Sequence, residues 1–117
     1  MRTADKALCW TYGFIAAAAL VATWSENLRF FAVPDNGGAL GFLRAMYANP
    51  AAASIANDLL LFAVAGCIFM VVEGRRAGVR FVYVYVLLAL VIAISVAFPA
   101  FLVARQIAMA QGASRSA

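Results

Sequence analysis

The sequence predicts an all-α integral membrane protein with three transmembrane helices and a short interfacial helix between the first and the second. Of its 117 residues, 67% are hydrophobic and 12% are charged, and the mean hydropathy is +0.94. A soluble domain of this length keeps far more of its surface polar, so this balance is typical of a membrane-embedded chain. The apolar residues also fall into three runs, each long enough for a hydrocarbon core of about 30 Å. The length allows one membrane domain, 1–117.

The first expected span covers residues 7–24, near the lower length limit for a transmembrane helix. A secretory signal peptide is the competing interpretation of an apolar run near the start of a chain. However, Trp10, Tyr12 and Phe14 make the run rich in aromatic residues, and segment 24–27 (WSEN) lacks a small-x-small cleavage pattern. We therefore expect a retained first helix.

A polar connection follows, and its segment 33–38 (VPDNGG) is dense in turn-forming residues. The next segment, 39–48, has a helix-compatible pattern of apolar residues but is too short to span a membrane. The pattern predicts a short helix at the membrane interface. A lid over a cavity between the spans is the alternative interpretation of the same residues.

The second expected span covers residues 50–73 and has clear boundaries. Asn49 is a good N-cap, and Pro50 suits the first helical position because that N–H has no partner within a helix. The segment 73–76 (EGRR) closes the span, since glycine favours a C-terminal turn and cations complement the negative end of the helix dipole.

The third expected span is the uncharged run 81–104. Its valines and tyrosines also suit a β-strand, but an isolated strand in lipid leaves its backbone groups unpaired, so the length favours a helix. Pro99 removes the hydrogen bond to the carbonyl of Ser95 and predicts a kink. The tail 106–117 is rich in small residues and is expected to be frayed.

Asp58 is the main candidate for a functional site, because it lies roughly 13 Å inside the second span at 1.5 Å per residue. An ionisable group at this depth is costly and usually faces the protein interior. Ser95 is expected at a similar depth in the third span, and Asn57 adds an amide beside the acid. Two interpretations stay open: a hydrogen-bonding residue that fixes helix packing, or a site for a proton, an ion or a polar lipid headgroup.

Glu73 is expected to form an ion pair at the membrane surface, within the basic group Arg75, Arg76 and Arg80. Arg76 and Arg80 are its expected partners, since Arg76 follows by three residues on the same helix. Glu73 lies about 22 Å from Asp58 along the helix, which is too far for two carboxylates to share acid–base chemistry.

The net charge of +4 does not indicate nucleic-acid binding, because the cations lie singly or in short clusters beside apolar spans. They act as topology signals and lipid-headgroup contacts. A cluster of three cations, Arg75, Arg76 and Arg80, lies in and beside a short loop and favours a cytoplasmic N-terminus. With three spans, the C-terminus is then expected on the outside. The expected inner set is then Arg2, Lys6, Arg75, Arg76 and Arg80, and the expected outer set is Arg29, Arg44, Arg105 and Arg115.

The composition predicts no metal site and no cofactor. Cys9 and Cys67 both lie in expected spans without a CxxC spacing, and the chain has no histidine to complete a metal site. Both thiols are therefore expected to be free and buried.

Four patches carry a resemblance to a family. They read YANP at 47–50, NDLL at 57–60, EGRR at 73–76 and S-x-A-x-P-x-F-L-x-x-R at 95–105. In this order and spacing they resemble a bacterial family of small integral membrane proteins classified as a domain of unknown function. The resemblance covers roughly residues 10–105.

The chain departs from that family at two positions near the last patch. Ala93 stands where glycine is commoner in the family, and Ala100 stands where a bulky residue is commoner. These differences affect the details of helix packing. The resemblance implies a multi-pass protein of the bacterial cytoplasmic (inner) membrane, and it implies no activity.

Three functions remain open. The first is a non-enzymatic accessory or structural subunit of a larger membrane complex, which fits the lack of a nucleophile–base set or phosphate loop. The second is an oligomeric transporter or channel unit that uses Asp58. The third is an enzyme acting on an isoprenoid or another lipid, which needs a cavity around Asp58 lined by Trp10, Tyr12, Phe62 and Phe98. An enzyme is the less favoured class. The expected partners are the lipid bilayer and either a larger membrane complex or further copies of the chain.

Overall fold

The computed structural model describes residues 2–116, with side chains for 2–112, and this part of the chain is helical without strands. Three of its helices are long and apolar enough to cross a membrane: α1, α3, and α5 as far as Gly112. The predicted fold class is therefore confirmed, and a short helix, α2, lies between the first and second spans. The elements in chain order are α1 (Thr3–Ala32), α2 (Gly38–Ala45), α3 (Pro50–Ala77), α4 (Val82–Val91) and α5 (Ile94–Ser116).

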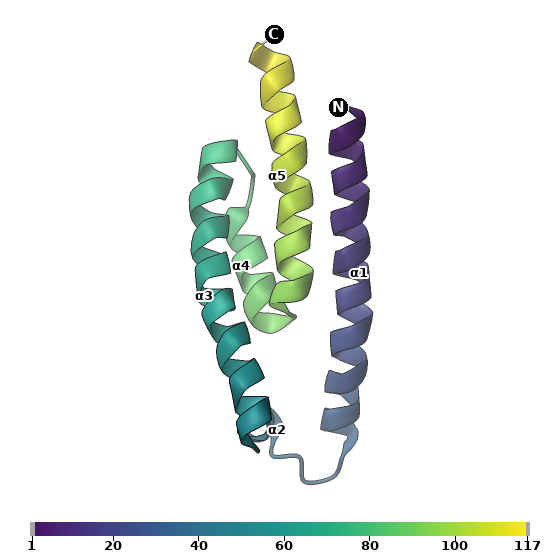
Figure 1. Ribbon diagram of the computed structural model, residues 1–117, viewed down its shortest axis with the longest axis vertical. Coiled ribbons are helices and arrows are strands. Elements are labelled where there is room, and N and C mark those ends of the chain that lie inside the picture. Colours follow the sequence, from purple (N-terminus) through teal and green to yellow (C-terminus); the bar gives the residue numbers. More distant parts are fainter. Residues whose placement is uncertain (1, 117) are drawn as a thin grey trace.

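The helices form an elongated bundle of 58 × 23 × 23 Å (Figure 1). Helices α1 and α3 run in opposite directions along its length, and α2 lies at the end where they are connected. Helices α4 and α5 form a hairpin that enters from the other end and reverses partway along the bundle. Helix α5 is central, because it packs against α1, α3 and α4.

The sequence signals that bound α3 act as expected at its start. The Asn49 side chain accepts a hydrogen bond from the backbone N–H of Ala52 at 2.8 Å, and Pro50 occupies the first turn. At the other end, Gly78 adopts a left-handed conformation (φ 81°) and its N–H bonds the carbonyl of Gly74. Because Gly78 rather than Gly74 ends the helix, α3 extends beyond the predicted limit of residue 73.

The prediction of one continuous helix over 81–104 is wrong. The run divides into α4, which ends at Val91, and α5, which begins at Ile94. Helix α4 is about 15 Å long, and the rise from Ile94 to Arg105 is about the same, so Arg105 returns to the level at which α4 began. Pro99 lies inside α5, so the chain reverses before the proline and not at it. Helix α5 also includes the part of the expected tail up to Ser116.

A side chain from α1 stabilises the reversal. The indole N–H of Trp24 donates to the carbonyl of Ile92 at 3.0 Å. The backbone N–H groups of Ile92 and Ala93 both donate to the carbonyl of Leu88, at 2.8 and 3.2 Å. Since lipid offers no hydrogen bonds, backbone groups at such a turn need partners within the protein. Trp24 is thus part of the hairpin's structure, although it lies 68 residues away in the sequence.

The core lies between α3, α4 and α5. Met70 and Phe101 are completely buried there, and Val82 and Ile94 belong to the same cluster. Gly74 permits this packing, since a Cβ at that position would lie 3.1 Å from Cε2 of Phe101 and closer still to the Val82 side chain. The glycine that was expected to end α3 therefore allows α4 and α5 to approach it closely.

The hairpin places the beginning of α1 and the end of α5 at the same end of the bundle (Figure 1). This arrangement does not fit the expectation of termini on opposite sides of a membrane. That expectation assumed that residues 81–104 cross once, whereas α4 and the first half of α5 enter and return. Arg105 consequently lies with the residues of the predicted inner set and not with those of the outer set.

Candidate functional site

A cluster of paired charges lies at the end of the bundle where α3 ends. Glu73 is buried, with 8% of its surface exposed. Its carboxylate accepts hydrogen bonds from Nε and Nη2 of Arg76, at 2.8 and 2.6 Å, and from Nε of Arg105, at 2.8 Å. Arg76 is a partner that the sequence indicated. The sequence did not indicate Arg105 as a partner, because Arg105 was expected on the other side of the membrane.

A second buried carboxylate lies nearby on α1. Asp5 accepts a hydrogen bond from Nε2 of Gln106 at 2.5 Å and another from the backbone N–H of Arg2 at 3.1 Å. The side chain of Arg2 adds an ion pair, with Nε 3.6 Å from Asp5 Oδ2. The sequence carried no signal for this contact, since Asp5 and Gln106 are 101 residues apart.

The two buried carboxylates are linked through neighbouring residues of α5. Arg105 bonds α3 through Glu73, and Gln106 bonds α1 through Asp5. Each acid has several donors, which satisfies its charge in a partly buried position. Among the described residues, no group of three or more His, Cys, Asp or Glu could hold a metal ion. The arrangement is suited to holding three helices together.

Arg75 and Arg80 do not pair with Glu73 and remain exposed on the outside of this cluster. The guanidinium of Arg75 hydrogen-bonds the hydroxyl of Tyr83 and lies 5.4 Å from the centre of that ring. Arg80 lies 5.4 Å from the centre of the Phe81 ring. Among the described residues, neither arginine forms a salt bridge with a carboxylate, so both keep an uncompensated positive charge.

The structure does not bring together the predicted intramembrane site. Asp58 is exposed, and no hydrogen bond or ion pair involves it within the described part of the chain. It lies one helical turn before Phe62, whose ring contacts Phe98 of α5, yet the Asp58 side chain itself is left uncovered. Ser95 is exposed at the start of α5, and Asn57 instead accepts a hydrogen bond from the Tyr47 hydroxyl at 2.9 Å.

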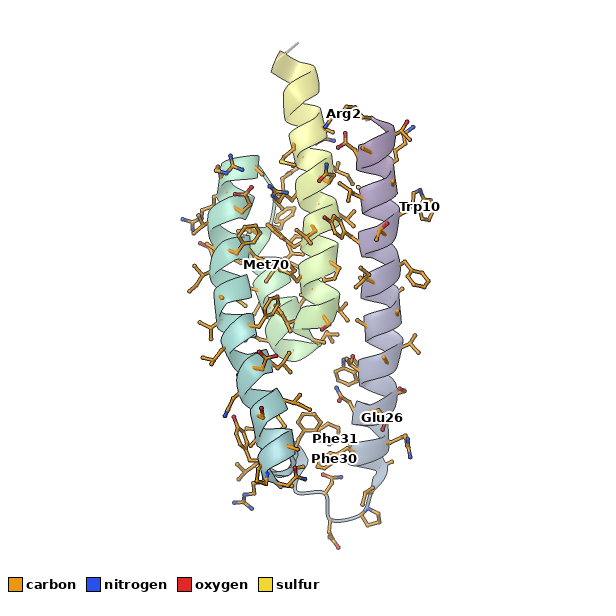
Figure 2. All side chains as sticks on the ribbon, in the orientation of Figure 1. Arg2, Trp10, Glu26, Phe30, Phe31 and Met70 are labelled. Carbon is orange, nitrogen blue, oxygen red and sulfur yellow. The ribbon has the colours of Figure 1, made fainter. Side chains whose placement is uncertain are left out.

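The aromatic residues expected around the acid do not gather in one place, because Trp10 lies apart from the others. Trp10 is 80% exposed and projects from α1 away from the other helices (Figure 2). Phe62 and Phe98 contact each other, with ring centres 5.9 Å apart, so this pair links α3 with α5. Trp10 therefore cannot line an enclosed cavity with this pair around Asp58. Cys9 and Cys67 are both free thiols, but they are half-buried and not fully buried as expected.

Comparison with known proteins identifies a family and no activity. The sequence profile of a family described as protein of unknown function DUF2834 matches residues 11–107. No curated protein and no solved structure matches the chain. The profile covers the parts of α1 and α5 that carry the Trp24 contact and the Glu73–Arg105 contact, together with all of α2, α3 and α4. Because the match spans most of the sequence, the chain belongs to the DUF2834 family of proteins of unknown function.

Proposed function

We propose that this protein is a non-enzymatic accessory subunit of a larger membrane complex, and that the surface of α3 around Asp58 contacts another polypeptide. The observation that carries this proposal is an exposed carboxylate in the candidate membrane span α3 that has no partner among the described residues. Every buried side-chain nitrogen and oxygen in the described part of the chain has a hydrogen-bond partner. Exposed Asp58, by contrast, has no hydrogen-bond partner in that part of the chain.

The depth of Asp58 follows from the length of α3. If the buried Glu73 cluster marks one boundary of the hydrocarbon core, Asp58 lies about 22 Å from that boundary by the helical rise. The core is about 30 Å thick, so Asp58 lies about 8 Å inside the opposite boundary. An aspartate facing lipid at the centre of a membrane helix costs on the order of 3 kcal/mol in insertion experiments, and such residues usually face protein or water.

The surroundings of Asp58 suit a helix–helix contact. Ser54, an exposed small residue, lies one turn before it on the same face of α3, whereas Phe62, one turn after it, packs against Phe98 of α5. Small residues allow two helix backbones to approach closely, and hydroxyl or carboxyl groups then bond across the interface. A partner helix with a polar group at this depth would satisfy Asp58.

The orientation that we propose has both termini on the cytoplasmic side of a bacterial inner membrane. The fold brings six cations with described side chains to the end that holds the termini and leaves two at the other end. Short cytoplasmic segments are enriched in Lys and Arg, so this asymmetry supports the proposed orientation. The six are Arg2, Lys6, Arg75, Arg76, Arg80 and Arg105, and the two are Arg29 and Arg44.

An oligomeric transporter or channel unit is a second candidate, and the α4–α5 hairpin favours it. Interrupted helices that end inside the membrane are common where transporters bind substrates and ions. However, Asp58 is exposed in the single chain, so an enclosed pathway at this residue would have to form between two copies of the chain. The lipid-enzyme alternative has less support, since Trp10 projects away from the other helices and from the Phe62–Phe98 pair.

Purification of the tagged protein from its native membrane in mild detergent tests the proposal, with mass spectrometry and sizing of the complex. We expect stoichiometric co-purification with other membrane proteins. Asp58→Asn should leave assembly nearly normal, because an amide still forms hydrogen bonds, whereas Asp58→Leu should reduce recovery of the partner. Glu26→Gln is the matched control, since this exposed acid pairs with Arg29 at the other surface. Recovery of a homo-oligomer alone would contradict the accessory role. Flux assays would then test the transporter or channel candidate.

A further inference from the structure

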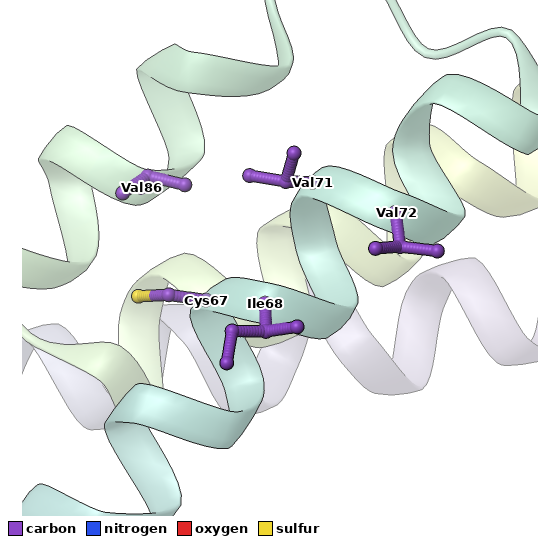
Figure 3. Close-up of a pocket in the computed structure, with 5 residues that line it drawn as sticks. All are labelled: Cys67, Ile68, Val71, Val72 and Val86. Carbon is purple, nitrogen blue, oxygen red and sulfur yellow. The ribbon is translucent and has the colours of Figure 1, made fainter.

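An apolar groove runs between α3 and α4 on the outside of the bundle (Figure 3). Its volume is about 320 Å³, and it is open at the surface. Ile68 and Val72 are 60% and 62% exposed, so the groove faces lipid rather than the core. The lining residues are Cys67, Ile68, Val71, Val72 and Val86.

Two polar side chains lie at the end of the groove nearest the α3–α4 connection. Arg75 follows Val71 by one helical turn on α3, and Tyr83 precedes Val86 by one turn on α4. The hydrogen bond between Arg75 and Tyr83 therefore joins the two helices directly beyond the apolar lining. Arg80 lies in the connection between the same helices. The lining of the groove thus changes from hydrocarbon side chains to guanidinium groups within about one helical turn.

The described residues do not neutralise the positive charge at this end of the groove. Glu73 is the nearest carboxylate in the sequence, and its oxygens already accept from Arg76 and Arg105. Arg75 and Arg80 contact only aromatic rings and a phenol hydroxyl among the described residues. Guanidinium groups bind phosphate well because their planar donors match two phosphate oxygens.

We infer that this groove binds an anionic phospholipid, with one acyl chain along the apolar lining and the headgroup phosphate held by Arg75 and Arg80. The apolar lining excludes a purely polar ligand, and the two cations favour an anionic headgroup over a zwitterionic one. Basic sites between membrane helices on the cytoplasmic side bind anionic lipids in this way. The inference does not depend on the proposed accessory function or on Asp58.

Native mass spectrometry of the purified protein measures this binding directly. Phosphatidylglycerol and phosphatidylcholine with identical acyl chains are titrated separately, and the apparent Kd of each is obtained. We expect tighter binding of phosphatidylglycerol. Arg75→Gln should weaken it about fivefold, and the double variant with Arg80→Gln roughly 25-fold, at about 1 kcal/mol per cation. Arg44→Gln is the control, since Arg44 is exposed near the opposite end of the bundle.

A second pair of variants tests the acyl-chain part of the site. Val72→Phe fills the groove and should weaken phosphatidylglycerol binding several-fold. Val64→Phe is its matched control, because Val64 is 60% exposed on α3 but does not line the groove. Far-UV circular dichroism and sizing show whether each variant is folded. Glycerol 3-phosphate at the same concentration should not displace the lipid.

Three kinds of result would overturn the inference. The first is equal affinity for the two lipids. The second is an equal loss of affinity in Arg44→Gln and Arg75→Gln, which would indicate a general charge effect. The third is displacement by glycerol 3-phosphate or no effect of Val72→Phe, which would indicate a site for a free anion without a bound acyl chain.

Discussion

Arg105 in α5 donates from Nε to Oε1 of Glu73 in α3 over 2.8 Å, across 32 residues of sequence. This contact exists only because the chain reverses at Ile92 and Ala93. A continuous helix through this region would carry Arg105 to the opposite end of the bundle. The Glu73–Arg105 pair is therefore a direct indicator of the α4–α5 hairpin.

Replacement of Arg105 by Gln should lower the melting temperature of the detergent-solubilised protein. The substitution removes the positive charge that Glu73 receives from α5, while Arg76 still pairs with the acid. Glu73→Gln should have a smaller effect in the Arg105→Gln background than in the unmodified protein, because contacting residues are not additive. Fully additive effects would contradict a direct contact between the two side chains. Arg44→Gln is the control and should leave the melting temperature unchanged.

Both termini are expected on the same side of the membrane. A reporter that is active on only one side, fused first to the beginning of α1 and then to the end of α5, should give the same result at both positions. The same reporter in the connection between α1 and α2 should give the opposite result. Opposite results for the two termini would indicate that residues 81–104 cross the membrane once, and would contradict the hairpin.

The sequence was sufficient for the fold class, since length and hydropathy alone separate a membrane-embedded chain from a soluble domain. Local signals were also sufficient at the start of α3, where Asn49 and Pro50 act within one turn. The hairpin could not be predicted, because neither Ile92 nor Ala93 is a turn-forming residue. Its stabilising partner, Trp24, belongs to a different helix.

The candidate site was harder to predict than the helices. Helical rise gave Asp58 and Ser95 the same depth, but this estimate assumed that residues 81–104 form one straight helix. Depth also does not indicate whether a side chain is covered by a neighbouring helix, and Asp58 is exposed. By contrast, the Glu73–Arg76 contact lies within one turn of a single helix, where spacing alone indicates the neighbour. The Asp5–Gln106 contact depends on the complete fold and has no local signal.

Trp24→Phe should loosen the hairpin, because phenylalanine keeps the ring but cannot donate to the Ile92 carbonyl. Loss of one hydrogen bond costs about 1 kcal/mol. Hydrogen–deuterium exchange at residues 92–97 should therefore become faster, since local opening exposes these amides. Trp10→Phe is the matched control, because Trp10 is 80% exposed and forms no hydrogen bond in the described part of the chain. Equal exchange in the two variants would show that the Trp24 contact does not stabilise the turn.

Gly74→Ala should destabilise the bundle, because the added methyl group meets the side chains of Val82 and Phe101. Overpacking of this kind costs about 1–3 kcal/mol. Gly13→Ala is the matched control, since a Cβ at Gly13 has no atom within 4 Å and alanine is the better helix former. Thermal unfolding in detergent should therefore give a lower melting temperature for Gly74→Ala and an unchanged or higher one for Gly13→Ala.

The double variant Gly74→Ala with Val82→Ala should recover part of the loss, because removing the valine methyl groups restores space between α3 and α4. An unaltered melting temperature in Gly74→Ala would mean that α4 does not pack against α3 as closely as the structure describes.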